Sequence, residues 1–213
     1  MYLSILRLNP RSRRAMTEVS RPYELHRSLM AAFPDKATGG AGRVLFRLDI
    51  DHETGGMSVL VQSEKEPDWD KINGATGFIT EYKSKQYDPV FVLGQVLSFR
   101  LRANPTKRLG KSAGDDQGKR VGIYDEKQLL EWLQRKVETG GFHIVRAMVS
   151  QDEKIEDKPK HESTRPALEL LSVQFDGILK VENVELACLT ISQGIGSGKG
   201  FGFGLLSIAP YRG

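Results

Sequence analysis

The sequence of 213 residues has little of what marks several common protein classes. It contains one cysteine, Cys188, which excludes intramolecular disulfides and zinc sites built from several thiolates. Its apolar stretches are only a few residues long, far below the roughly 20 that a bilayer requires. Arg7 interrupts the N-terminal MYLSILRLNP too early for a signal peptide. The sequence therefore predicts a cytoplasmic protein with no membrane contact.

Metal ligands are also scarce. There are four histidines, and they form no HxxxH pair; there is no CxxC motif and no dense Asp/Glu cluster at ligand spacing. His52, His143 and His161 lie in a predicted turn, a strand and a charged loop, where a catalytic role is not favoured. The sequence thus predicts neither a metal site nor a cofactor.

What the chain does have is a soluble, globular composition with clustered positive charge. Hydrophobic residues make up 39% and charged residues 27%, and the net charge is +4. Residues 1–27 hold six arginines against two glutamates, a net +4, and residues 100–120 hold seven basic residues against two aspartates, a net +5. The combined net charge of these two segments exceeds that of the whole chain, so the rest of the chain has a net negative charge. Such asymmetry indicates a polyanionic partner, although solvated loops also explain such runs.

The order of predicted elements is similar in the two halves. In the first half, hydrophobic periodicity predicts a strand, a helix, a hairpin and a further strand, at residues 2–8, 22–33, 43–50, 57–62 and 95–103. The basic stretch after the first strand is expected to be a loop, and the stretch around Pro67 and Gly77 irregular or helical.

In the second half, a short strand at 121–124 leads to a helix that begins after Asp125 and ends at Gly140. Strands at 142–149 and 167–177, a helical pattern at 184–191 and a strand at 205–209 follow. The charged segment 150–165 is expected to be a loop. We therefore predict an α+β fold of tandem ferredoxin-like (RRM-like) βαββαβ domains. Their expected ranges are 1–110, with the helix of His26, and 119–213, with a glycine-rich loop.

A glycine-rich loop, residues 194–204 (GIGSGKGFGFG), is the most unusual local feature. Glycine at every second position allows positive φ angles and close backbone approach, and leaves N–H groups open to a phosphate. Gly196, Gly198, Gly200 and the single cation, Lys199, are the candidate contacts. A Walker motif is excluded, because the glycine spacing is wrong, no Ser or Thr follows the lysine, and the tract leads into a strand. The alternative is a flexible hinge packed against a helix.

The first predicted helix carries a candidate catalytic pair. Leu25, Leu29 and Phe33 share its buried stripe, whereas Tyr23 and His26 lie one turn apart on an adjoining face. An imidazole titrates near neutral pH and can carry a proton, and a phenol beside it can orient or relay one. Arg27 could neutralise a phosphate. A half-exposed histidine without catalytic function is the alternative.

Together these motifs resemble the CasE family of CRISPR-associated endoribonucleases, which process repeat RNA. The resemblance covers essentially the whole chain and is carried by the strand ending in LNP, Pro22-Tyr23-x-x-His26-Arg27, EPDW at 66–69, FRLRANPTKR at 99–108, and GIGSGKGFGFGLLSIAP at 194–210. It implies binding of the repeat stem-loop, metal-independent cleavage at the base of the stem, and partnership with other subunits of a CRISPR surveillance complex.

The resemblance places catalytic roles on His26 and Tyr23, and the chemistry of RNA cleavage predicts the roles that follow, with His26 serving both proton-transfer steps as the alternative. His26 would protonate the 5′-oxygen leaving group and Tyr23 would orient the attacking 2′-OH, leaving a 5′-OH and a 2′,3′-cyclic phosphate or 3′-phosphate. Arg27 and Lys199 would stabilise the developing charge. The expected RNA contacts are Arg13, Arg102, Lys107 and Arg108, the glycines Gly196, Gly198 and Gly200, and, on a basic hairpin of the second domain, Lys158 and Lys160. A non-catalytic RNA-binding subunit of such a complex remains the alternative function.

Overall fold

The structure is a computed structural model that describes residues 1–51, 53–73, 77–157 and 168–212. Its strands are β1 (Tyr2–Leu8), β2 (Val44–Ile50), β3 (Met57–Ser63), β4 (Ile79–Gln86), β5 (Val96–Ala103), β6 (Thr106–Arg108), β7 (Arg120–Gly122), β8 (Phe142–Asp157), β9 (Leu168–Val181) and β10 (Leu206–Pro210). Its α-helices are α1 (Arg13–Val19), α2 (Pro22–Met30), α3 (Asp70–Asn73), α4 (Glu126–Glu138) and α5 (Val184–Gln193). Short 3₁₀ helices are η1 (Lys36–Thr38), η3 (Lys111–Asp116) and η4 (Lys199–Phe201).

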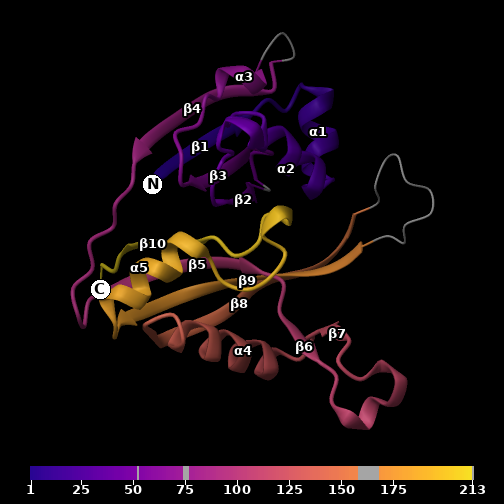
Figure 1. Ribbon diagram of the computed structural model, residues 1–213, viewed down its shortest axis with the longest axis vertical. Coiled ribbons are helices and arrows are strands. Elements are labelled where there is room, and N and C mark those ends of the chain that lie inside the picture. Colours follow the sequence, from indigo (N-terminus) through magenta and orange to yellow (C-terminus); the bar gives the residue numbers. More distant parts are fainter. Residues whose placement is uncertain (52, 74–76, 158–167, 213) are drawn as a thin grey trace.

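Two four-stranded antiparallel sheets organise the chain, and both have the same topology. The first has the order β2-β3-β1-β4 and the second the order β10-β5-β9-β8. Numbered within its own sheet, each runs 4-1-3-2, the order in which a split βαβ motif places its strands. The first unit lies above the second in Figure 1, and the β6–β7 hairpin projects from the second. The predicted tandem ferredoxin-like fold is confirmed.

The predicted place of residues 95–103 is wrong. We expected this strand to complete the first unit, but β5 pairs with β9 and β10 in the second sheet. The short strand expected at 121–124 to open the second unit is instead β7, which pairs only with β6. The chain therefore passes from one sheet to the other between Gln86 and Val96, and the range 1–110 includes a strand of the second unit. Pairing partners are far apart in sequence, so periodicity alone did not reveal them.

Three further elements differ from the predicted ones. The strand β4 closes the first sheet at its edge, and only Ile79 of its residues is buried, so it has no apolar face that a pattern could reveal. The helix α1 replaces part of the expected basic loop; Ser12 caps it by accepting a hydrogen bond from the Ala15 amide. The strand β8 extends to Asp157, well into the segment 150–165 that is expected to be a loop, whereas β9 begins at Leu168, close to the predicted start of its strand.

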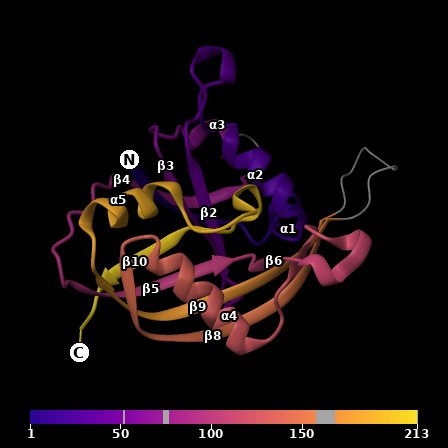
Figure 2. The same cartoon turned by 60° about the horizontal axis from the view of Figure 1, so that its bottom comes forward.

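Each sheet packs its helices on one face. Leu25 and Leu29 of α2 join Leu6 and Val59 in the first core, and α4 and α5 cover the second sheet (Figure 2), with Leu133 and Ile191 in its core. No helix of the described residues combines the length and the apolar composition that crossing a bilayer requires.

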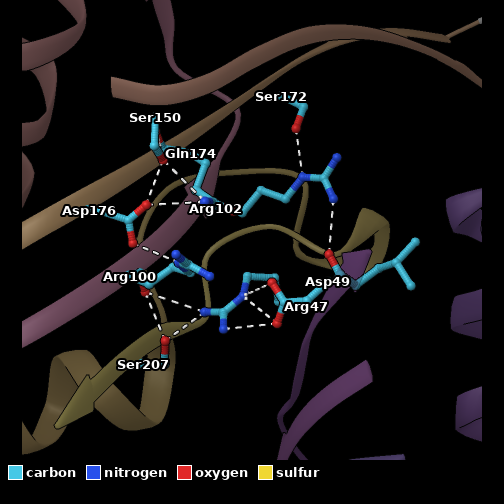
Figure 3. A network of polar contacts seen from close by, with 10 residues as sticks. Arg47, Asp49, Arg100, Arg102, Ser150, Ser172, Gln174, Asp176 and Ser207 are labelled. Carbon is cyan, nitrogen blue, oxygen red and sulfur yellow. Dashed lines mark hydrogen bonds and ion pairs between the residues drawn. The ribbon is translucent and has the colours of Figure 1, made fainter. Parts of the chain in front are cut away.

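The strand β2 is buried on both faces and joins the two units. Phe46 belongs to the first core, whereas Arg47 points toward the second unit, as Figure 3 shows. Its guanidinium is paired with Asp49 and donates to the Ser207 hydroxyl of β10. Gln62 of β3 donates to the Ile191 carbonyl of α5 over 2.7 Å. Buried and partly buried polar contacts thus link the two sheets, which do not pair strands with each other in the described part of the chain.

Candidate active site and RNA-binding surface

The helix α2 presents the predicted catalytic pair on the face that meets the glycine-rich loop. Pro22 occupies its first turn and Glu24 complements the positive end of the helix dipole. Burial of Leu25 and Leu29 fixes the rotation of the helix, so that Tyr23 is 47% exposed and His26 is half-buried. Their ring centroids lie 6.4 Å apart. The predicted proximity of these two side chains is therefore confirmed.

The His26 imidazole lies between the two units. One face stacks on Phe46 of β2, with ring centroids 6.0 Å apart and planes inclined by 13°. On another side is Gly200, where a Cβ atom would stand 3.7 Å from Nε2. The Nδ1 atom is buried and has no hydrogen-bond partner among the described residues. Burial lowers the pKa of His26 because the charged form loses hydration. The free protein therefore favours the neutral ring at pH 7.

The glycine-rich loop wraps around the edge strand β2. Gly194 approaches Leu45 so closely that a Cβ atom would stand 2.8 Å from a methyl carbon, and Gly202 lies against Phe46 on the opposite face of the strand. Both glycines have positive φ, at 73° and 83°. Figures 1 and 2 both show the loop reaching from the second unit to α2. Glycine is thus required here for close approach between the units, and the hinge interpretation covers only part of its role.

Lys199 stands in this loop, in a strongly positive environment. Its pKa is lowered, first by partial burial and then by repulsion from Arg43 and Lys136. Phe201, two residues on, contacts Tyr23 with ring centroids 5.9 Å apart. The second unit therefore places one aromatic ring against Tyr23, on the loop that also carries the Lys199 cation. Such a field favours an anionic ligand at the junction.

The predicted RNA contacts have different surroundings. Arg13 and Arg108 are exposed. Lys107, also exposed, donates to Gln128 over 2.8 Å, and Arg27 is paired with Glu24 and is 61% exposed. Gly196, Gly198 and Gly200 all lie in the loop beside α2, whereas Lys158 and Lys160 lie outside the described residues. The RNA-binding roles of these residues stay predictions.

Arg102 takes part in the contact between the units. Its guanidinium donates to the Ser172 hydroxyl over 2.7 Å and to the Leu48 carbonyl of β2 over 3.2 Å (Figure 3). Its neighbour Arg100 is paired with Asp176 at 2.6 Å. Part of the donor set of Arg102 is therefore already used within the protein, which leaves fewer N–H groups for RNA.

Sequence reasoning missed Phe46 and Phe201, the rings that contact the candidate pair. Phe46 reads as an ordinary core residue of a strand, and nothing in its spacing relates it to His26. Phe201 stands between two glycines, but so does the fully buried Phe203, so its place in the sequence did not distinguish it as a site residue. The described residues contain no group of three or more potential metal ligands.

Comparisons with known proteins identify similar chains. The family model described as "CRISPR associated protein" matches residues 1–210. The CRISPR-associated endoribonuclease Cse3 of Thermus thermophilus is 37% identical, over 99% of this chain and all of the relative. The CRISPR system Cascade subunit CasE of Escherichia coli is 31% identical over 88% of this chain and 92% of the relative. A solved structure of Cse3 bound to a 19-nucleotide RNA superposes with a TM-score of 0.88 at 37% identity, over 99% of this chain and all of that one.

Proposed function

Because the chain belongs to this family of CRISPR-associated proteins, we propose that it is an endoribonuclease that binds the stem-loop of CRISPR repeat RNA and cleaves it to produce guide RNA. The single observation that carries the proposal is the position of His26, half-buried beside Gly200 of the glycine-rich loop that also carries Lys199. A half-exposed histidine beside a glycine-rich loop, whose backbone N–H groups and lysine can bind an anion, suits a phosphate as substrate. A partnership with other subunits of a surveillance complex and a cytoplasmic location belong to the same proposal.

The reaction needs only the RNA, this chain's side chains and water. The 2′-oxygen of the ribose attacks the adjacent phosphorus, its proton passes to solvent, and the bond from phosphorus to the 5′-oxygen breaks. His26, in its protonated form, gives its proton to that departing oxygen. The products are a 5′-OH and a 2′,3′-cyclic phosphate, which can hydrolyse to a 3′-phosphate. Cleavage at the base of the stem gives each guide RNA a defined end.

The remaining site residues would position the RNA and balance its charge. Tyr23, exposed one helical turn from His26, would orient the 2′-OH, since a phenol is a weak base at neutral pH. Lys199 and Arg27 would stabilise the negative charge that develops on the phosphate oxygens. Bound phosphate would also raise the pKa of His26, since a nearby anion favours the imidazolium. RNA binding itself would thus prepare the acid.

One assay tests the function. The pure protein is incubated with a repeat stem-loop in excess EDTA, alongside the same RNA with a 2′-deoxy sugar at the cleavage site. We expect specific cleavage in EDTA, none of the deoxy RNA, and none by His26→Ala, which still binds RNA. Tight binding without cleavage by the wild-type protein would support the alternative of a scaffold subunit, and loss of cleavage in EDTA would contradict the metal-independent reaction.

A further inference from the structure

A cationic pocket lies at the far end of the glycine-rich loop from His26. Its volume is about 280 Å³, and Lys107, Arg108, Arg120 and Lys136 surround it. The side of Trp132, a 5% exposed ring that stacks on Phe175, forms part of its wall. Gly196 of the loop completes it, and a Cβ atom there would stand 3.3 Å from the Trp132 ring. Three separate elements, the β6–β7 hairpin, α4 and the loop, thus converge on one small space.

The cations of this pocket are unbalanced. Arg108 and Arg120 are directly opposite each other in the β6–β7 pairing, an arrangement of like charges that destabilises a hairpin. Among the residues that the structure describes, no carboxylate forms an ion pair with Arg108, Arg120 or Lys136. Repulsion from Lys136 also contributes to the lowered pKa of Lys199. An anion in the pocket would relieve all of these repulsions at once.

The pocket is close to the candidate catalytic histidine along the loop. Gly196 lines the pocket and Gly200 lies beside His26, so the two points are four positions apart in the chain. Even a fully extended chain of that length spans at most about 14 Å. A polynucleotide whose reacting phosphate lies at His26 therefore reaches the pocket within a few nucleotides.

We propose that this pocket binds one backbone phosphate of the RNA, a few nucleotides from the phosphate that is cleaved. Arg120 and Lys136 are the contacts that sequence analysis did not identify. The inference rests on the proposed function and specifies how the RNA strand is held in register against His26. Two fixed phosphates, one at His26 and one in the pocket, would set both the position and the direction of the strand.

The test is a phosphate-neutralisation scan read as binding. Stem-loop RNAs carry a 2′-deoxy sugar at the cleavage site, which prevents cleavage, and one uncharged methylphosphonate at each linkage in turn. We expect one linkage near the cleavage site to weaken binding to the wild-type protein about tenfold, the loss of one charge-assisted contact. The variant Arg120→Gln/Lys136→Gln should bind the unmodified RNA about as weakly, and it should no longer respond to that substitution.

A matched control separates a specific contact from general charge. Lys119→Gln/Arg135→Gln removes the same charge from the adjacent residue of the same hairpin and the same helix, outside the pocket. It should keep the wild-type scan profile. The proposal would be overturned if the pocket variant Arg120→Gln/Lys136→Gln gave the same scan profile as the wild-type protein. It would also be overturned if neutralising any linkage weakened binding to the wild-type protein equally. Competition by inorganic phosphate at constant ionic strength, with no linkage-specific effect, would assign the pocket to a free anion and overturn it too.

Two further measurements keep the outcome interpretable. Lys136→Gln alone leaves the hairpin intact and should reduce the response at the same linkage; an unchanged response would contradict the proposal even if the double variant failed to fold. Failure of the proposed function has a different signature, because it appears as uncleaved all-ribose RNA with the wild-type protein. The binding scan does not depend on cleavage, so the two failures are distinguishable.

Discussion

The two units share one strand order, yet they bring different chemistry to their junction. The first unit contributes side chains that can transfer or orient a proton, His26 and Tyr23 on α2. The second contributes backbone and charge through the glycine-rich loop with Lys199, whose other end lines the cationic pocket. Neither sheet carries both sets. The candidate site therefore belongs to the contact between the units, where one helix of the first meets one loop of the second.

The largest expected effect is on the cleavage rate, and it separates the proton donor of the first unit from the charge of the second. We expect His26→Ala to lower the single-turnover cleavage rate by about 10²- to 10⁴-fold, because it removes the proton donor, with little change in affinity for uncleavable RNA. Lys199→Ala removes one charge contact and should lower the rate about tenfold, with a parallel loss of affinity. Rate and binding assays on both variants decide this. Equal losses of rate in the two variants would contradict the division of roles, in which the first unit supplies the proton donor and the second supplies charge.

The contact between the units can be broken at Arg47. This arginine is 6% exposed, so Arg47→Met leaves the Asp49 carboxylate and the Ser207 hydroxyl without their shared partner. We expect the free energy of unfolding to fall by about 2 kcal/mol, reduced from the value for a fully buried pair because Asp49 is 30% exposed. Denaturant unfolding measures it.

The matched variant for Arg47 is Arg100→Met. The Arg100 side chain is 46% exposed, and its partner Asp176 also accepts hydrogen bonds from Ser150 and Gln174. We expect a loss below about 1 kcal/mol. A loss as large as that of Arg47→Met would contradict the expectation that the more buried pair between the sheets contributes more than the exposed pair within one sheet.

Two glycines test how far the close approach of the glycine-rich loop to the first unit depends on the absence of a side chain. Gly202→Ala places a Cβ atom at positive φ and 3.1 Å from the Phe46 ring, on which His26 stacks. We expect it to cost about 1 kcal/mol of stability and to slow cleavage. Gly200→Ala makes only ordinary contacts with His26, at 3.6 Å or more, and should change stability by less than about 0.5 kcal/mol. Thermal unfolding and cleavage rates of both variants test the difference.

The smallest expected effect is a proton taken up on binding. Burial lowers the pKa of His26 in the free protein, so the ring is neutral at pH 7. If bound phosphate raises that pKa, affinity for uncleavable RNA should rise as the pH falls toward 6, by at most tenfold per pH unit. Titration calorimetry in buffers of different ionisation enthalpy counts the proton. Uptake that persists in His26→Gln would assign it to another group, and no uptake would favour a neutral His26 that first accepts the 2′-OH proton.

Much of the fold could be predicted because its elements carry local signals. The helix after Asp125 was identified from its cap, and that carboxylate accepts a hydrogen bond from the Gln128 amide as expected. The sequence did not predict the edge strand β4, because all of its residues except Ile79 are exposed. Such a strand has no alternation of apolar and polar residues. The assignment of β5 was wrong because its pattern reports a buried face and not which sheet buries it.

The amino-acid sequence alone determined which chemistry is available: an imidazole and a phenol one helical turn apart, a glycine-rich loop with one lysine, and two basic segments. These features depend on residue type and on short spacings, both of which can be read directly from the amino-acid sequence. Only the tertiary structure decided that the loop wraps around β2 to meet His26, that Phe46 stacks on it, and that Arg120 and Lys136 face one pocket. Those contacts join residues distant in sequence, and their formation depends on how two similar sheets pack, which no local pattern encodes.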